Sequence, residues 1–338
     1  MEILGIGAKN DGCSYHRVFL PIAYMDKTRG KITNNLNEDV FDGWDILLIN
    51  RLIYNFSIEQ LKSLKHKFGF KFVVDMDDHW ILNHGHILKD LYDSDLTPKV
   101  IECMRLADLV TCTHERLAAD ISHINPNVEV LPNALPYGDG QFSVKCQPSD
   151  KMRIIWCGGL THQQDMRLLK NPMKRVATDS SLSKKVHMVF GGYTDQKDAK
   201  PIADDMLHSF TCGLKIPGEI RGARHVFEYM EIYEDTDVSV VPLLPSKFNS
   251  SKSNLKVLEA AACGNACIVS RVDPYLGFPE DTVLYVDNQA DWYRHIKYLA
   301  DNPNARIDRA AKLQEYCHEH YNLFTVSKTR RQILDQLL

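Results

Sequence analysis

A regular alternation of strand-like and helix-like segments restricts the fold of this 338-residue chain more than any other feature. Between the apolar runs lie amphipathic stretches such as 57–68 and 97–107, where Ser57 and the Thr97-Pro98 pair are typical helix starts. Alternation at this spacing predicts βαβ units and a parallel sheet. The apolar runs that we expect to form strands are 2–8, 45–50, 71–77, 109–113 and 128–133.

A second series of the same kind follows a polar, turn-rich stretch at 138–151, which we interpret as a linker. Its strand-like runs are 153–159, 186–192, 214–218, 238–243, 266–270 and 283–287. Its clearest helical stretches are 290–301 and 304–321, and the chain ends in an amphipathic stretch from Val326. We therefore predict an α/β protein with two doubly wound, Rossmann-like domains: an N-terminal domain at 1–145, a C-terminal domain at 146–322, and a helix in 323–338 that packs back on the N-terminal domain.

Composition indicates an ordinary globular protein rather than a nucleic-acid binder or a membrane protein. The 40 basic and 44 acidic residues give a formal charge of −4, and no apolar run approaches the roughly 20 residues of a spanning helix. The nine cysteines are odd in number and include no C-x-x-C pair, which is typical of reduced thiols. Since the start of the sequence also lacks a secretory pattern, we expect a cytoplasmic protein without a transmembrane segment.

The stretch that follows the run 238–243 has the features of a phosphate site. Ligands of an open parallel sheet bind beyond the carboxyl ends of its strands, and here a loop leads to a helix that we expect to begin near Ser253. Free N–H groups and the helix dipole suit a phosphate, Lys252 and Lys256 add positive charge, and Ser251 or Ser253 adds a hydroxyl.

Glu259 lies about two turns into that helix, where its carboxylate could accept hydrogen bonds from the paired hydroxyls of a ribose. A diphosphate at the helix start and a ribose at Glu259 together describe a nucleotide-sugar site. The alternative is a capped surface helix on which Glu259 is solvated.

The motif "KSNLKVLEAAACGNACIVS" (252–270) resembles the donor site of retaining GT-B glycosyltransferases of glycosyltransferase family four. Glu259 matches the second, ribose-binding glutamate of that family, whereas Ser251 stands where its first glutamate is usual. The segments 107–134, 153–165 and 226–243 resemble other parts of the same family in the same order, so the resemblance covers nearly the whole chain. It implies two domains facing across a cleft, a UDP- or GDP-sugar as co-substrate, no bound metal and no further cofactor.

The resemblance also implies which residues contact the donor. Many family members carry an Arg and a Lys after the glycine turn at Gly159, but this chain has His162 there, so other cations, including Arg17, would have to replace that charge. His162 could instead be a structural histidine bonded to its own loop, and Arg17 could be a surface residue of the first helix. The donor-binding residues that we predict are Gly12, Arg17, Gly159, His162, Lys252, Ser253, Asn254, Lys256 and Glu259.

The cluster "VVDMDDHW" (73–80) ends an apolar strand and has three interpretations. Asp75 and Asp77 fit the D-x-D spacing of a metal-dependent GT-A enzyme, which two doubly wound domains disfavour. A helix cap and turn is the simplest interpretation. We favour an acceptor pocket in which Asp77 or Asp78 orients or deprotonates the acceptor hydroxyl beside His79, and we predict these three residues as catalytic, with no metal site.

We therefore expect a glycosyltransferase that moves a sugar from a nucleotide diphosphate, with retention, to a hydroxyl of a glycan or another compound. Because parts of the chain resemble phage-borne members, the second acceptor that we consider is a hydroxymethylated base of phage DNA. Such a base would have to flip out of the duplex to reach the enzyme, which would then act in the host cytoplasm. A non-catalytic sugar-nucleotide-binding protein or an epimerase on the same scaffold are further alternatives. The sequence does not indicate the oligomeric state.

Overall fold

Two parallel β-sheets organise the computed structural model, which describes residues 1–8, 10–143 and 146–338. Within these residues each sheet has six strands, and the chain divides into two compact units. The first unit comprises Met1–Ala134, Ser250–Ser253 and Tyr321–Leu338, and the second comprises Leu135–Asn249 and Asn254–His320. Residue 145, where we expected the N-terminal domain to end, lies outside the described residues.

The sheet of the first unit has the strand order β2-β1-β3-β4-β5-β6, with all neighbours parallel. From β1 the chain moves outward to β2 on one side and then crosses to β3 and beyond on the other. The sheet therefore has a switch point between β1 and β3, where ligands of such folds bind. The strands are β1 (Glu2–Ile6), β2 (Arg29–Thr33), β3 (Ile46–Asn50), β4 (Lys71–Met76), β5 (Leu109–Cys112) and β6 (Val128–Val130).

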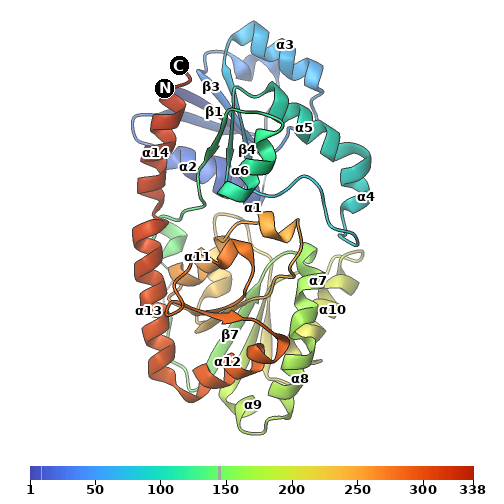
Figure 1. Cartoon of the computed structure of the whole chain (residues 1–338), viewed down its shortest axis with the longest axis vertical. Coiled ribbons are helices and arrows are strands. Elements are labelled where there is room, and N and C mark those ends of the chain that lie inside the picture. Colours follow the sequence, from blue (N-terminus) through green and yellow to red (C-terminus); the bar gives the residue numbers. More distant parts are fainter. Residues whose placement is uncertain (9, 144–145) are drawn as a thin grey trace. The chain divides into compact units, whose positions relative to one another are not determined.

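Helices cover both faces of this sheet (Figure 1). One face packs on α3, α5 and α6, and the other packs on α2 and α14. On that second face, a Cβ at Gly5 of β1 would lie 2.6 Å from Ile22 of α2, so only glycine allows this close approach. The helices are α1 (Gly12–Ser14), α2 (Leu20–Ala23), α3 (Ile58–Phe68), α4 (Lys89–Leu91), α5 (Thr97–Leu106), α6 (Glu115–Ser122) and α14 (Leu323–Asp335), with π-helical turns at Tyr15–Phe19 and Tyr92–Leu96.

The predicted helix over 57–68 is confirmed together with its start signal. Ser57 caps α3 by accepting from the Gln60 N–H, the Gln60 side chain bonds back, and Gly69 ends the helix in the left-handed region with φ 73°. Strand β2 was not predicted, because it is an edge strand of sequence RGKIT whose side chains are mostly exposed and carry no apolar run.

The sheet of the second unit has the order β12-β11-β10-β7-β8-β9, again with parallel neighbours. Its switch point lies between β7 and β10. The predicted strand at 214–218 is wrong: Leu214 has φ 62°, and the edge strand begins only at Gly218. The strands are β7 (Met152–Cys157), β8 (Val186–Tyr193), β9 (Gly218–Gly222), β10 (Val238–Val241), β11 (Ala266–Ser270) and β12 (Val283–Val286).

Alternate residues of these strands pack on α8, α10 and α12, and the opposite face contacts α11 and α13 (Figure 1). The predicted helices over 290–301 and 304–321 are confirmed as α12 and α13. The two units thus have the doubly wound α/β architecture that the sequence predicts. The helices are α7 (Gln163–Met166), α8 (Lys170–Thr178), α9 (Leu182–Lys185), α10 (Lys200–Thr211), α11 (Leu255–Ala262), α12 (Gln289–Asp301) and α13 (Pro303–His320), with 3₁₀ turns at Gly140–Phe142, Leu160–His162, Arg167–Leu169, Tyr229–Tyr233 and Asp273–Tyr275. Of the other two 3₁₀ turns, Glu38–Phe41 belongs to the first unit and Asn249–Ser251 runs into its segment Ser250–Ser253.

In the part of the chain that the structure describes, no helix combines the length and the apolar character needed to span a membrane.

Candidate functional site

The switch point of the second sheet collects several of the residues that the sequence predicts for the donor. Gly159 and His162 follow β7, and the loop after β10 leads into α11, which carries Lys256 and Glu259. Because β7 and β10 are neighbouring parallel strands, these loops leave the sheet at the same edge.

Glu259 is a buried residue of α11, with 5% of its surface exposed. Its Oε2 accepts a hydrogen bond of 2.7 Å from the Tyr233 hydroxyl. Burial and the nearby Glu259 charge raise the pKa of Tyr233 well above its usual value, so the phenol stays protonated and acts as a donor. The alternative of a solvated Glu259 on a surface helix is therefore wrong. The helix itself begins at Leu255, slightly later than we expected, and Asn254 occupies the N-cap position without a side-chain cap bond.

Lys256 lies at the carboxyl end of β7, where its ammonium donates to the Cys157 carbonyl over 2.7 Å. A Cβ at Gly158 would meet the Lys256 nitrogen at 3.3 Å and Trp156 at 2.9 Å, so the first glycine of the turn is closely packed. A Cβ at Gly159 would meet only the Thr161 hydroxyl, at 4.0 Å. The turn therefore leaves space beside Gly159, and Lys256 is fixed next to it by its hydrogen bond to the Cys157 carbonyl.

His162 is joined to Asp165, with 2.9 Å between its Nδ1 and the carboxylate Oδ2. The other carboxylate oxygen of Asp165 accepts from the Leu244 N–H at 2.8 Å and from the Asn249 amide at 3.1 Å. His162 is therefore bonded within its own loop through Nδ1, as the structural interpretation expects.

Lys252 and Ser253 belong to the short segment that groups with the first unit. The Lys252 ammonium lies 3.4 Å from both carboxylate oxygens of Asp78. Ser251, which replaces the first glutamate of the resembling family, is fully buried, so its hydroxyl is not presented to a phosphate at an open surface. Among the predicted donor residues, the second unit itself holds Gly159, His162, Asn254, Lys256 and Glu259.

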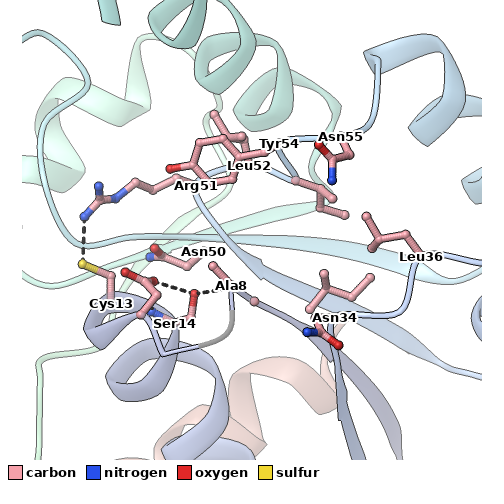
Figure 2. Close-up of a pocket in the computed structure, with 14 residues that line it drawn as sticks. Ala8, Cys13, Ser14, Asn34, Leu36, Asn50, Arg51, Leu52, Tyr54 and Asn55 are labelled. Atoms are coloured by element: carbon pink, nitrogen blue, oxygen red, sulfur yellow. Dashed lines mark hydrogen bonds between the residues drawn. The ribbon is translucent and has the colours of Figure 1, made fainter. Parts of the chain in front are cut away.

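The first unit has a cavity of about 230 Å³ at the switch point of its sheet (Figure 2). The lining comes from the ends of β1 and β3, the start of α1 and the residues after β2. Figure 2 shows polar side chains on several sides of the cavity, which suits a ligand rich in hydroxyl groups. The polar residues of the lining are Asp11, Cys13, Ser14, Asn34, Asn50, Arg51, Tyr54 and Asn55.

Arg51 is the charged residue at the centre of the contacts in this pocket, and the sequence analysis missed it together with the asparagines and Tyr54. Its guanidinium donates to both carboxylate oxygens of Asp77, at 2.8 and 3.0 Å, and to the Cys13 sulfur at 3.1 Å. Arg51 directly follows Asn50 at the carboxyl end of an apolar strand, and this position was the available signal. Its φ of 61° shows that the turn holds it in the left-handed region.

Asp77 is held as an anion by this contact. Burial alone would raise the pKa of Asp77, but the charge and hydrogen bonds of Arg51 outweigh burial and hold that pKa well below the usual range. A carboxylate of this kind orients its partners and is a weak base at neutral pH. Asp78 keeps 23% of its side chain exposed and lies 3.4 Å from the Arg51 guanidinium.

His79 is buried away from the residues that line the pocket. Its Nδ1 accepts from the Ile81 N–H at 2.9 Å, its Nε2 lies 3.3 Å from Asp120, and its ring stacks on Trp80. This corrects our expectation that His79 stands beside a reacting hydroxyl, because both ring nitrogens already face protein groups.

Arg17 is also placed differently from the sequence-based expectation. Its guanidinium is buried and donates to both oxygens of Asp75, at 2.7 and 3.0 Å, to Asn133 at 2.8 Å and to the Leu131 carbonyl at 2.8 Å. With its donors committed, Arg17 does not present a phosphate clamp, nor is it a surface residue. Gly12 opens α1 in an unstrained conformation, with nothing within 4 Å of an added Cβ.

The D-x-D interpretation also fails on geometry, because Asp75 pairs with Arg17 while Asp77 pairs with Arg51. In the described ranges, no three His, Cys, Asp or Glu side chains come together as a metal site would require.

Comparisons with known proteins agree with the fold described above. Residues 151–302 match the family model described as glycosyl transferases group 1. The structure of Anabaena HepE in complex with UDP and glucose superposes with a TM-score of 0.70 at 12% identity, covering 99% of this chain and 100% of that one. A search of curated proteins finds no match.

Two further solved structures show the same fold. Sucrose-phosphate synthase from Thermosynechococcus elongatus gives a TM-score of 0.65 at 16% identity, with 87% of this chain and 74% of that chain covered. A UDP-forming α,α-trehalose-phosphate synthase from Burkholderia xenovorans gives 0.62 at 13% identity, with 88% and 75% covered. The chain therefore has the GT-B glycosyltransferase fold, which excludes a GT-A enzyme, and the match of 151–302 supports a glycosyltransferase.

Proposed function

We propose that this protein transfers a sugar from a nucleotide diphosphate, with retention, to a hydroxyl group of a glycan or another polyhydroxylated compound. The observation that carries the proposal is the buried Glu259, held by Tyr233 at the switch point of the second sheet, inside the stretch that matches group 1 glycosyltransferases. The HepE structures with UDP and UDP-glucose favour a UDP-sugar as donor, with a GDP-sugar as the alternative.

In this proposal, the second unit binds the leaving group. Glu259 accepts hydrogen bonds from the ribose hydroxyls, while Lys256 and the open turn at Gly159 face the diphosphate. As the bond to the sugar breaks, the diphosphate gains negative charge. Cations and N–H groups that are already in place stabilise this charge without reorganising, which makes electrostatic stabilisation the largest catalytic effect available here.

The pocket of the first unit is the proposed acceptor site. Asn34 and Asn55 supply amide donors and acceptors for sugar hydroxyls, and Asn50, whose amide donates to Asp75 and Asp77, supplies its carbonyl oxygen. Tyr54 is 61% exposed, as a stacking surface for a sugar would be. We assign Asp78 to the acceptor hydroxyl. It contacts the Arg51 guanidinium, which lines the pocket, at 3.4 Å and keeps 23% of its side chain exposed, whereas both carboxylate oxygens of Asp77 are bound by Arg51.

The test is thermal stabilisation by a panel of UDP- and GDP-sugars and free nucleotides, with and without magnesium. A ligand of the native state at 100 times its Kd adds about 2.7 kcal/mol of stability and raises the melting temperature. We expect one nucleotide series to raise it equally in both conditions. Glu259→Gln should abolish the shift, whereas Glu315→Gln, on the exposed face of α13, should leave it unchanged.

Transfer of a labelled sugar to glycan acceptors and to hydroxymethylated DNA then separates the acceptors. Binding without transfer would contradict catalysis and indicate a sugar-nucleotide-binding protein. Interconversion of free nucleotide sugars would indicate an epimerase. No stabilisation by any nucleotide would refute the donor site.

A further inference from the structure

The cavity at the switch point of the first sheet is small and combines two kinds of side chain (Figure 2). Its volume of about 230 Å³ lies below the roughly 300–1,000 Å³ of pockets that enclose drug-sized ligands, so it has room for one sugar ring rather than for a longer glycan. The amides of Asn34 and Asn55 can bind hydroxyl groups, while apolar side chains pack on the C–H faces of such a ring. The apolar side chains of the lining are Ile6, Ala8, Leu36, Leu52 and Ile53.

Arg51 is the only cation among the described residues of this lining, and Lys9 lies outside the described residues. All three nitrogens of the Arg51 guanidinium have partners. Nε and Nη2 donate to the two carboxylate oxygens of Asp77, over 2.8 and 3.0 Å, and Nη1 donates to the Tyr92 hydroxyl over 3.2 Å. Figure 2 shows the guanidinium reaching toward Cys13, whose sulfur accepts from it at 3.1 Å. The Arg51 charge is therefore balanced within the protein.

Asp11 lines the same cavity and caps α1. Its Oδ2 accepts from the N–H and from the hydroxyl of Ser14, each over 2.7 Å, and these neutral partners leave the negative charge of the carboxylate in place. Asp78 lies 3.4 Å from the Arg51 guanidinium and 3.4 Å from the Lys252 ammonium. Counting the carboxylate that Arg51 binds, three carboxylates and two cations of the described chain are gathered here, so the acids are in excess.

The Cys13 thiol reports the electrostatic environment of the cavity. Burial raises the pKa of this thiol well above its usual value, and the charges of Asp77, Asp11 and Asp78 raise it further, while Arg51 partly opposes them. An environment that raises a thiol pKa disfavours any negative charge at the same place. A phosphate or carboxylate group of a ligand would meet the same burial and the same acids, whereas a hydroxyl group would not be penalised in this way.

We propose that this pocket selects one uncharged sugar ring, either a free monosaccharide or the terminal unit of a glycan, and that Asp11 makes it reject sugars that carry a phosphate or a carboxylate. The inference rests on the proposed function, in which this pocket holds the acceptor, and it names the acceptor class. A binding site rejects the wrong ligand by placing a like charge or an unpaired group against it. Asp11 supplies the like charge, and Arg51, bound to Asp77, supplies no counter-charge.

The experiment is ligand-observed NMR titration of the full chain with glucose, galactose and mannose. The 6-phosphate of each sugar, and glucuronate, are then measured by how well they displace the uncharged sugar, so that binding elsewhere on the protein does not contribute. We expect at least one of the three sugars to bind. Its anionic counterparts should displace it with an affinity about tenfold lower or weaker still, because like charges placed together are costly.

Two substitutions locate the binding and its selectivity. Tyr54→Ala removes an exposed ring of the lining and should weaken binding of the uncharged sugar about threefold to tenfold, whereas Tyr298→Ala on α12 should have no effect. Asp11→Asn keeps the helix cap, because asparagine caps as well as aspartate. It should leave the affinity for the uncharged sugar unchanged and improve displacement by the 6-phosphate about three- to tenfold. Glu315→Gln makes the same change of net charge on α13 and should not improve it.

Four outcomes would overturn the inference. None of the three sugars binds, Tyr54→Ala leaves their binding unchanged, a 6-phosphate competes as well as its own sugar, or Asp11→Asn improves displacement no more than Glu315→Gln does. Failure of the proposed function is seen separately, because stabilisation by a nucleotide needs no acceptor. Selective binding of an uncharged sugar by a chain that no nucleotide stabilises would overturn the proposed transfer and leave the selectivity of the pocket standing.

Discussion

At the scale of single residues, the contact between Glu259 and Tyr233 fixes the orientation of a buried carboxylate. The phenol donates to one carboxylate oxygen over 2.7 Å, and its raised pKa keeps it a donor at any physiological pH. A helix that simply carried a glutamate would leave it free to rotate in water. Here burial and the tyrosine restrict the carboxylate to one orientation, which the proposed recognition of a ribose requires.

Tyr233→Phe should therefore weaken donor binding without removing the carboxylate. The variant loses one buried hydrogen bond, so we expect about 1–2 kcal/mol less stability and an affinity for the diphosphate reduced about tenfold. Urea unfolding and calorimetric titration measure the two effects. Tyr298→Phe, which changes an exposed phenol on α12, is the matched control. Unchanged affinity in Tyr233→Phe would mean that Glu259 does not contact the ligand.

Gly159 offers a test of how closely a ligand approaches the backbone. Any residue can adopt its φ of −87°, and an added Cβ would meet only the Thr161 hydroxyl, at 4.0 Å. We expect Gly159→Ala to keep its melting temperature within about 1 °C and to lose diphosphate affinity, because the methyl group would occupy ligand space. Gly12→Ala, equally open in the structure, is the control. If both variants bind normally, the ligand does not pack on this turn.

At the scale of elements, β4 and α14 are joined by a buried charge cluster. Asp75 accepts from Arg17 and from the Thr111 hydroxyl at 2.5 Å, and Arg330 of α14 lies 3.6 Å away. Burial lowers the pKa of Arg330 to about 10, although Asp75 partly offsets this effect. A base whose pKa is lower in the folded state than in the unfolded chain is destabilised as a cation. At pH 7 the Arg330 charge therefore costs stability.

Two substitutions in this cluster should have opposite consequences. Asp75→Asn leaves two buried guanidinium groups without an anion, and we expect a loss of about 3–5 kcal/mol in the free energy of unfolding. Arg330→Met keeps the volume of the side chain and removes the destabilised charge, so the free energy of unfolding should stay the same or rise. Urea unfolding at pH 7 measures both. A loss of several kcal/mol in Arg330→Met would show that its ion pair holds α14 in place.

At the scale of the whole molecule, each unit carries its own candidate site at its own switch point, the pocket in the first and the Glu259 region in the second. Residues 135–320 contain the complete second sheet and, in addition, the short segment Ser250–Ser253 that groups with the first unit. We expect this fragment to fold and to be stabilised by the same diphosphate as the full chain. Circular dichroism and melting curves test this, with Glu259→Gln in the fragment as the control. If the fragment folds but no nucleotide raises its melting temperature, the first unit is required for donor binding.

Much of the fold and part of the site could be predicted because the relevant signals are local. Apolar runs such as ILLIN at Ile46–Asn50 are buried on both faces of a parallel sheet, and they alternate with amphipathic helices whose caps can be recognised, as at Ser57. The same order of segments placed Gly159 and Glu259 near the ends of strands. Edge strand β2 escaped prediction, because an exposed strand needs no apolar pattern.

The sequence by itself thus determined two doubly wound α/β units and the position of Glu259 at the edge of the second sheet. Only the tertiary structure decided what each polar residue contacts. The guanidinium of Arg17 is bound by the buried Asp75, and the ring nitrogens of His79 contact Ile81 and Asp120. Arg51, which carried little local signal, lines the pocket and binds Asp77. The physical reason is that secondary structure follows from residues close in the chain, while the charge and orientation of a buried group depend on partners that may be more than 50 positions away, as Asp75 is from Arg17.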